Sequence, residues 1–246
     1  MKRLLHGFVM CQSMFCAIPC PLRIWDEDAR DLMLPMLPFL GLEIGAIWAF
    51  LGWLTGLLGL PALVRGLILG VYPYLATGFL HLDGFMDVTD AVKSCRDLPK
   101  RREILKDSHV GSFAVIGLCL LVIAQVVLFA SVSQEKTSLI LLFVPAVSRC
   151  GSALAVTGLP AMSTSQYAAQ KKPTSRLWWL GGLTCVLVGL SFVLCGKLGF
   201  AAVGCLVGYG LALRRGYRSL AGMNGDIAGY ALTLGELWAA AVYALI

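Results

Sequence analysis

Charged residues are scarce in this chain. Only 14% of its 246 residues are Asp, Glu, Lys or Arg, whereas 58% are hydrophobic. Soluble domains carry about 25% charged residues, and a soluble chain this apolar would expose large apolar patches and aggregate. The mean hydropathy of +0.80 indicates the same class of protein. The deficit of charge therefore excludes a water-soluble domain and predicts a protein that lies in a lipid bilayer.

Several common motifs are also absent. The chain has no Walker A sequence, no G-x-G-x-x-G and no G-x-S-x-G, so neither a P-loop nor a nucleophile elbow is expected. Its nine cysteines include no C-x-x-C pair, which disfavours a zinc site. We interpret these cysteines as small buried hydrophobic residues. Because no P-loop is present to bind ATP, the energy for any group transfer must come from an activated substrate.

Long apolar runs are abundant instead. A helix needs about 20 apolar residues to cross about 30 Å of hydrocarbon, and uncharged runs of that order recur along the chain. We expect seven membrane-spanning helices, at about 33–58, 62–82, 111–133, 138–159, 177–196, 198–213 and 227–246. Residues 1–25 are interpreted as a retained interfacial or re-entrant segment. The predicted fold class is all-α, a polytopic integral membrane helix bundle.

The distribution of basic residues predicts the orientation. If the N-terminus is cytoplasmic, only Arg65, Lys136 and Lys197 of the 20 Lys and Arg residues fall outside. Cytoplasmic loops carry such an excess of positive charge, so the net charge of +6 reflects topology and requires no nucleic acid. We expect one domain over residues 1–246. Its catalytic loops are expected on the cytoplasmic side, near 83–110, 160–176 and 214–226.

Three aspartates lie at and just beyond the end of the second predicted span, in the sequence HLDGFMDVTD. Asp83, Asp87 and Asp90 have the spacing i, i+4 and i+7, which places them on one stripe if the helix continues past the membrane surface. Adjacent carboxylates repel one another, and Mg²⁺ commonly binds a few carboxylates, waters and substrate phosphates. The stripe predicts a magnesium site, with His81 and Gly84 as substrate-binding neighbours. A solvated acidic helix end is the simpler alternative.

A second polar cluster, Lys106-Asp107-Ser108, directly precedes the third predicted span. Amides at a helix N-terminus bind anions, and lysine supplies a point charge to phosphate. This cluster is therefore a candidate for contacts with a phosphorylated substrate. Ser108 has an equally simple interpretation as a helix N-cap.

Polar residues also interrupt the apolar runs. Arg149 lies in the fourth predicted span, and Glu43 and Glu236 lie in the first and last. Charges in lipid are costly, so we expect functional roles for them, although Arg149 can alternatively snorkel to the surface. We assign both glutamates to substrate binding. The start of the last span adds three candidate substrate-binding residues, Asn224, Gly225 and Asp226. The aspartate among them is otherwise explained as a helix cap.

These carboxylates and cations together fit Mg²⁺-assisted phosphoryl transfer. In addition, the segments HLDGFMDVTDAV, LKDSHVGSFAVIG, VPAVSRCGSAL and GMNGDIAGYALTLGEL occur in an order that resembles the cobalamin synthase family. The members of that family are adenosylcobinamide-GDP ribazoletransferases, and the resemblance covers nearly the whole chain. It implies that α-ribazole, or its 5′-phosphate, attacks adenosylcobinamide-GDP, that GMP leaves, and that Mg²⁺ is required.

The resemblance also implies roles for individual residues. The family's acidic motif falls on Asp83, Asp87 and Asp90, of which Asp90 either completes the metal site or acts as a general base. Lys106 and Arg149 would then counter phosphate charge. The predicted catalytic residues are Asp90, Lys106, Asp107, Ser108 and Arg149. The segment at 168–176 departs from the family's Arg-Pro-Gly loop before the fifth span.

The implied partners are adenosylcobinamide-GDP, α-ribazole and the lipid bilayer, without nucleic acid. The implied location is a prokaryotic inner membrane, with the active site facing the cytoplasm. Two further partners are compatible with the resemblance: a second copy of this chain, and other enzymes of cobalamin nucleotide-loop assembly. A CDP-alcohol phosphotransferase is the nearest alternative, but Leu80, Val88 and Thr89 break its usual motif. An intramembrane prenyltransferase would need a second Asp-rich motif, and an ion-coupled transporter would favour an inverted repeat; neither is found.

Overall fold

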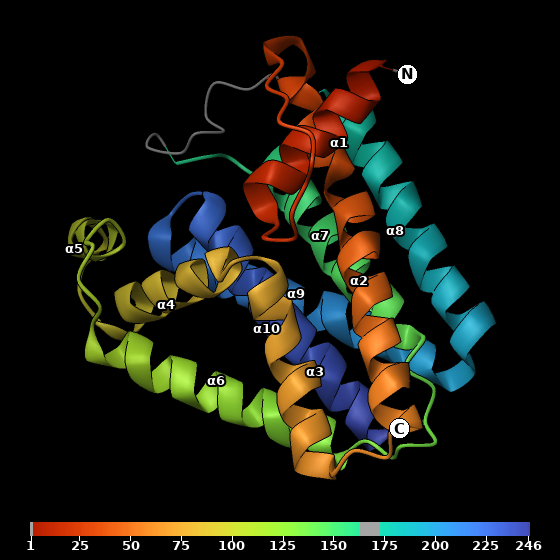
Figure 1. Cartoon of the computed structure of the whole chain (residues 1–246). Coiled ribbons are helices and arrows are strands. Elements are labelled where there is room, and N and C mark those ends of the chain that lie inside the picture. Colours follow the sequence, from red (N-terminus) through yellow and green to blue (C-terminus); the bar gives the residue numbers. More distant parts are fainter. Residues whose placement is uncertain (1, 163–172) are drawn as a thin grey trace.

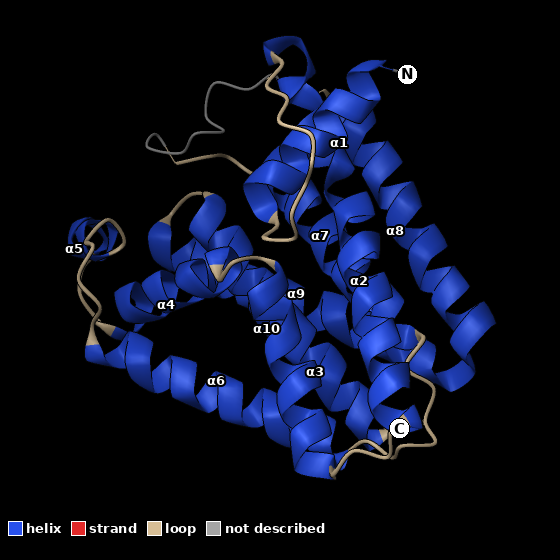
Figure 2. Cartoon of the chain, viewed as in Figure 1, coloured by secondary structure: helices blue, strands red, loops and turns tan. Residues whose placement is uncertain are grey.

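The protein is described by a computed structural model that covers residues 2–162 and 173–246. This part of the chain contains ten α-helices and two short 3₁₀ helices, and no β-strand (Figure 2). The α-helices are α1 (Lys2–Phe15), α2 (Met33–Leu57), α3 (Ala62–Ala76), α4 (Leu80–Lys93), α5 (Leu98–Ile104), α6 (Ser112–Ser131), α7 (Ile140–Gly158), α8 (Thr174–Cys195), α9 (Phe200–Leu220) and α10 (Gly225–Leu245). The 3₁₀ helices are η1 (Glu27–Leu32) and η2 (Gly196–Gly199). The predicted all-α class is confirmed.

Five helical stretches in the described residues are long and apolar enough to cross a membrane. They are Glu27–Leu57, Ser112–Ser131, Ile140–Gly158, Thr174–Leu220 and Gly225–Leu245. The bent pair of α3 and α4 would make a sixth, and Thr174–Leu220 contains both α8 and α9. The chain is therefore a multi-pass membrane helix bundle. The predicted number of seven spans and the cytoplasmic N-terminus stay predictions.

The three basic residues expected outside lie together at one end of the bundle. Lys136 and Lys197 donate hydrogen bonds, each of 3.0 Å, to the backbone oxygens of Tyr243 and Ile246 at the end of α10. Arg65 is buried and donates to the C-cap carbonyl of α6 at 2.7 Å. Helix α1 lies at the opposite end of the molecule (Figure 1). Basic side chains at helix C-termini are favoured by the unpaired carbonyls there.

The second predicted span ends earlier than expected. Helix α3 stops at Ala76, and α4 leaves it at an angle of 90°. The turn is made by Gly78 and Phe79, whose φ values are 58° and 65°, a left-handed conformation that ends a right-handed helix. The amide of Ala17 satisfies the carbonyl of Ala76 at 2.8 Å. The predicted continuous helix over 62–82 is therefore wrong, and the aspartates lie on a separate helix.

Small residues bring α2 and α7 into close contact. Cβ atoms added at Gly41 and Gly45 would overlap the backbone of α7 near Ala146 and Leu142. Pro145 lies inside α7 at the same level. Glycines let transmembrane helices approach to backbone contact, so this pair forms a closely packed centre for the bundle. It also fixes the turn of α7 that carries Arg149.

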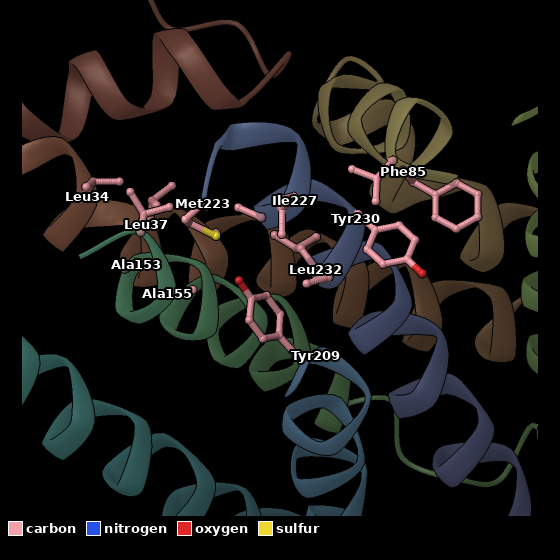
Figure 3. Close-up of a cluster of buried hydrophobic side chains, with 14 of the residues drawn as sticks. Leu34, Leu37, Phe85, Ala153, Ala155, Tyr209, Met223, Ile227, Tyr230 and Leu232 are labelled. Carbon is pink, nitrogen blue, oxygen red and sulfur yellow. The ribbon is translucent and has the colours of Figure 1, made fainter. Parts of the chain in front are cut away.

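Helix α4 is held in place by a buried hydrophobic cluster. Figure 3 shows Phe85 of α4 beside Tyr230 of α10, with the two rings stacked at 5.8 Å between centroids and 14° between planes. Ile227 and Leu232 of α10 lie in the same cluster. Phe85 is on the side of α4 opposite Asp83, because two residues turn a helix by about 200°. Packing on this apolar side therefore turns the aspartates away from the hydrophobic cluster.

Candidate active site

The three aspartates of the predicted stripe all lie in α4. Their helical spacing places them on one face, as expected from the sequence. Burial, and then the negative charges of neighbouring carboxylates, raise the pKa of Asp87 to about 6. The neighbours that contribute are Asp83, Asp226 and Asp90. Helix α4 alone is not one of the five candidate spans, and its acidic face forms the centre of the candidate site.

Asp226 brings a fourth carboxylate to this face from the start of α10. A Cβ added at Gly84 would lie only 2.9 Å from the backbone oxygen of Asp226, so the two helices touch at this point. Gly84 was predicted to be a substrate-binding neighbour of the stripe, but the space beside its Cα is filled by α10. Asn224 is the N-cap of α10, because its Oδ1 accepts a hydrogen bond from the amide of Ile227 at 3.0 Å. The cap interpretation of Asp226 is therefore wrong, and its Oδ2 accepts a hydrogen bond of 2.6 Å from Asn224.

Asp90 faces a different neighbour. A Cβ added at Gly111, the N-cap of α6, would overlap the carboxylate of Asp90. Backbone amides at a helix start have no partner within the helix and favour a nearby negative charge. Asp90 is thus the carboxylate of the stripe that lies nearest to α6.

The carboxylate cluster has no compensating cation in the described part of the chain. Asp83, Asp87, Asp90 and Asp226 take part in none of the ion pairs found there. The described part of the chain also contains no group of three or more His, Cys, Asp and Glu side chains close enough to enclose a metal ion. Mg²⁺ seldom uses an all-protein cage and usually keeps waters and substrate phosphates as ligands beside one or two carboxylates. An uncompensated cluster of oxygen donors fits that mode of binding.

A cavity of about 130 Å³ adjoins the cluster at Asp226. Its polar lining includes His81, Arg149, Ser152 and Gly225. Nε2 of the histidine and Nε of the arginine are buried without a hydrogen-bond partner among the described residues. Buried polar atoms are nearly always paired, so two unpaired nitrogens beside a cavity point to a ligand with acceptor oxygens. A Cβ atom added at Gly225 would have no neighbouring atom within 4 Å, so this side of the cavity is open.

Arg149 and Glu236 were predicted separately, and the structure joins them. Nη1 of Arg149 lies 2.9 Å from Oε1 of Glu236, and both side chains are almost fully buried. Ser148 donates a further hydrogen bond of 2.9 Å to the same carboxylate oxygen. Snorkelling of Arg149 to the surface is therefore wrong. Glu236 neutralises the arginine and does not line the cavity.

Glu43 is also outside the cavity. Its Oε1 accepts a hydrogen bond of 3.0 Å from Gln12 of α1, so it links the N-terminal helix to α2. No contact of Glu43 in the described residues supports its assignment to substrate binding, which stays a prediction.

The Lys106-Asp107-Ser108 cluster lies on the surface between α5 and α6. Ser108 does not cap α6, because the N-cap is Gly111. Asp107 accepts hydrogen bonds from the backbone amide of His109 at 3.0 Å and from its ring at 2.6 Å, and these lower the pKa of the Asp107 carboxyl. The side chains of this cluster are exposed, so its assignment to substrate contacts stays a prediction.

Some features of this region were not expected from the sequence. Arg101 and Arg102 of α5 donate to the backbone oxygens of Ser219, Leu220 and Ala221, at 2.8–3.3 Å, and hold α5 against the end of α9. Ser152 was also missed, although its position three residues after Arg149 would place both on one helix face. The expected catalytic loop at 160–176 falls in large part on residues 163–172, which lie outside the described residues.

Comparison with known proteins identifies the family. Residues 7–244 match the family model described as cobalamin-5-phosphate synthase. The chain belongs to this family. A member from Clostridium botulinum, named adenosylcobinamide-GDP ribazoletransferase, is 33% identical, with 96% of each chain covered. A relative of the same name from Clostridium perfringens is 34% identical, with 96% of each chain covered. Another, from Geobacillus thermodenitrificans, is 32% identical, with 79% of this chain and 76% of the relative covered. No solved structure matches significantly.

Membership in the cobalamin-5-phosphate synthase family decides between the alternatives raised by the sequence. The match spans nearly the whole chain, including all four carboxylates of the cluster. It therefore favours the predicted transferase over a CDP-alcohol phosphotransferase or an ion-coupled transporter.

Proposed function

We propose that this protein is a membrane transferase that joins adenosylcobinamide phosphate, from adenosylcobinamide-GDP, to α-ribazole or α-ribazole 5′-phosphate. A hydroxyl oxygen of the ribazole attacks the phosphorus next to cobinamide. The bond from that phosphorus to the bridging oxygen breaks, and GMP leaves with this oxygen. The hydroxyl proton passes to a base. The observation that carries the proposal is the family match over residues 7–244. It is supported by relatives named adenosylcobinamide-GDP ribazoletransferase that align over 96% of each chain.

The carboxylate cluster is the natural site for the diphosphate of the activated substrate. We assign Asp83 and Asp87, with Asp226 beside them, to a Mg²⁺ site at which waters and substrate phosphates supply most of the ligands, because these carboxylates are near enough to raise one another's pKa and have no ion-pair partner in the described residues. When bound, Mg²⁺ would neutralise diphosphate charge and stabilise the leaving GMP. Asp83 and Asp87 of α4 and Asp226 of α10 would hold the ion, and the contact at Gly84 fixes the relative placement of these two helices.

Asp90 is assigned a separate role in this proposal. It lies beside the start of α6, on the part of the stripe farthest along α4 from Asp83. Asp90 accepts the proton of the attacking hydroxyl, since a carboxylate near the reacting oxygen can serve as a general base. The exposed Lys106-Asp107-Ser108 cluster contributes positive charge and a hydroxyl donor to the phosphates.

The cavity beside the cluster receives an oxygen-bearing part of the substrate. Nε of Arg149 and Nε2 of His81 are buried there without partners among the described residues, and each can donate a hydrogen bond in the appropriate protonation state or tautomer. The pair with Glu236 keeps the guanidinium fixed, so no binding energy is lost in ordering it. The active site is assigned to the cytoplasmic face of a prokaryotic inner membrane, where the basic loops are retained.

The experiment is to incubate the purified protein with adenosylcobinamide-GDP, α-ribazole and Mg²⁺, and to identify the products by mass. Formation of the ribazole-linked corrinoid together with GMP is expected. Asp83→Asn and Asp87→Asn should each abolish most of the product. Asp28→Asn serves as the matched control, because Asp28 is exposed and belongs to η1. Failure of the parent protein to form either product would refute the proposed activity, and full activity of both variants would refute the site.

A further inference from the structure

A cleft is lined by residues of α4, α6, α9 and α10, on the side of α4 away from the aspartates. Two adjoining cavities, of about 320 and about 500 Å³, form this cleft and share Arg215, Tyr230 and Leu234. We call it the α6–α10 cleft. Phe85 and Tyr230 form part of its wall, and Figure 3 shows these two side chains together. None of the described residues that line it is acidic.

Most of the cleft wall is apolar and open to the surroundings of the bundle. Leu120 on α6 is 64% exposed, and Leu211 on α9 and Trp238 on α10 are 52% and 44% exposed. These helices belong to candidate membrane spans, so the surroundings are lipid. Water in an apolar cleft at this level is unfavourable, and an empty cleft loses dispersion contacts. An acyl chain fills such a cleft without either cost.

Cations line the end of the cleft formed by the C-terminal parts of α4 and α9. Helix α4 contributes Lys93, and helix α9 contributes Arg214, Arg215 and Arg218. All four are exposed, and none has an ion pair or hydrogen bond with another residue in the described ranges. Sorting of positive charge alone explains basic residues at this level, but not their convergence on one apolar cleft. Basic pockets between membrane helices bind anionic lipid headgroups.

We propose that the α6–α10 cleft binds an anionic diacyl phospholipid, with an acyl chain along the apolar wall and the phosphate among the four cations. The site is separate from the carboxylate cluster, because Phe85 and Asp83 are on opposite sides of α4. Binding depends on both parts of the lipid. A neutral phospholipid supplies only the chain, and a soluble phosphate ester supplies only the charge.

The test uses native mass spectrometry of the full-length protein, released from nanodiscs that contain equal amounts of phosphatidylglycerol and phosphatidylcholine. The parent protein should retain phosphatidylglycerol in preference to phosphatidylcholine, and excess glycerol 3-phosphate should not displace it. The triple variant Arg214→Gln, Arg215→Gln, Arg218→Gln should retain at least about tenfold less phosphatidylglycerol. The matched control replaces Lys2, Arg23 and Arg96 by Gln, three exposed basic residues outside the cleft.

Equal retention of the two lipids by the parent would overturn the proposal, and so would an unchanged preference in the triple variant. An equal loss in the control triple variant would assign the effect to net charge and would also overturn it. Displacement by glycerol 3-phosphate would show a phosphate site without a lipid chain and would likewise overturn the proposal. Because the readout is lipid retention, these results do not depend on the proposed transferase activity.

Discussion

Arg149 of α7 and Glu236 of α10 form a buried ion pair, with 2.9 Å between Nη1 and Oε1. Removing one member leaves the other charge unpaired inside the bundle, which costs about 3–5 kcal/mol for a buried pair. Glu236→Leu is therefore expected to lower the thermal unfolding midpoint in detergent. Replacing both residues, with Arg149→Met added, should recover much of that loss. A single variant as stable as the parent would contradict a buried pair.

Asp83 and Asp226 are predicted to act as one unit, because their helices meet at Gly84. Asp83→Asn and Asp226→Asn should each lower kcat/KM by on the order of 10²-fold. Residues that act together show strongly non-additive effects, so the double variant should lose little more than either single one. Steady-state GMP release measures all three. Losses that multiply in the double variant would place the two carboxylates in independent roles.

Gly84 is predicted to be required for packing of α4 on α10. A methyl group there would lie 2.9 Å from the backbone oxygen of Asp226 and 3.0 Å from its Cα, and such overpacking typically costs about 1–3 kcal/mol. Gly84→Ala should lower the unfolding midpoint and the activity together. Gly182→Ala is the matched control, because no atom lies within 4 Å of the Cβ it would add. Equal midpoints for the two variants would be evidence against close contact at Gly84.

Asp87 is predicted to destabilise the metal-free protein at neutral pH. Its pKa is raised to about 6 from a reference value of 3.8, so the folded state binds more protons than the unfolded state between these values. Stability should therefore fall as pH rises through this window. Asp87→Asn removes the charge, and in EDTA it should unfold at a higher temperature than the parent at pH 7.5. The difference should shrink as the pH falls from about 6 to about 4 and should be absent below that; a constant difference would contradict it.

The membrane fold was predictable because it depends on local composition. Apolar runs of the length needed to span a bilayer are visible in the sequence, and most predicted spans begin and end within a few residues of the observed helices. The acidic stripe was predictable for the same reason, since three aspartates at helical spacing share a face wherever that helix lies. Basic residues expected outside were also found together at one end.

Tertiary contacts could not be predicted from these patterns. The break at Gly78 and Phe79 is stabilised by Ala17, a residue about 60 positions earlier in the chain. Asp226 joins the stripe only because α10 packs against Gly84, and Glu236 pairs with Arg149 across two helices. Such contacts depend on which helices become neighbours, and helical periodicity in a single sequence carries no information about that.

The most direct measurement of the central claim is the Mg²⁺ concentration that gives half-maximal GMP release. The account predicts no turnover in EDTA and recovery on addition of Mg²⁺, because the diphosphate needs the ion held between α4 and α10. In Asp87→Asn the half-maximal concentration should rise by at least about tenfold, while Asp28→Asn should match the parent. Turnover that persists in EDTA, or the same half-maximal concentration in Asp87→Asn and the parent, would contradict a metal site at these carboxylates.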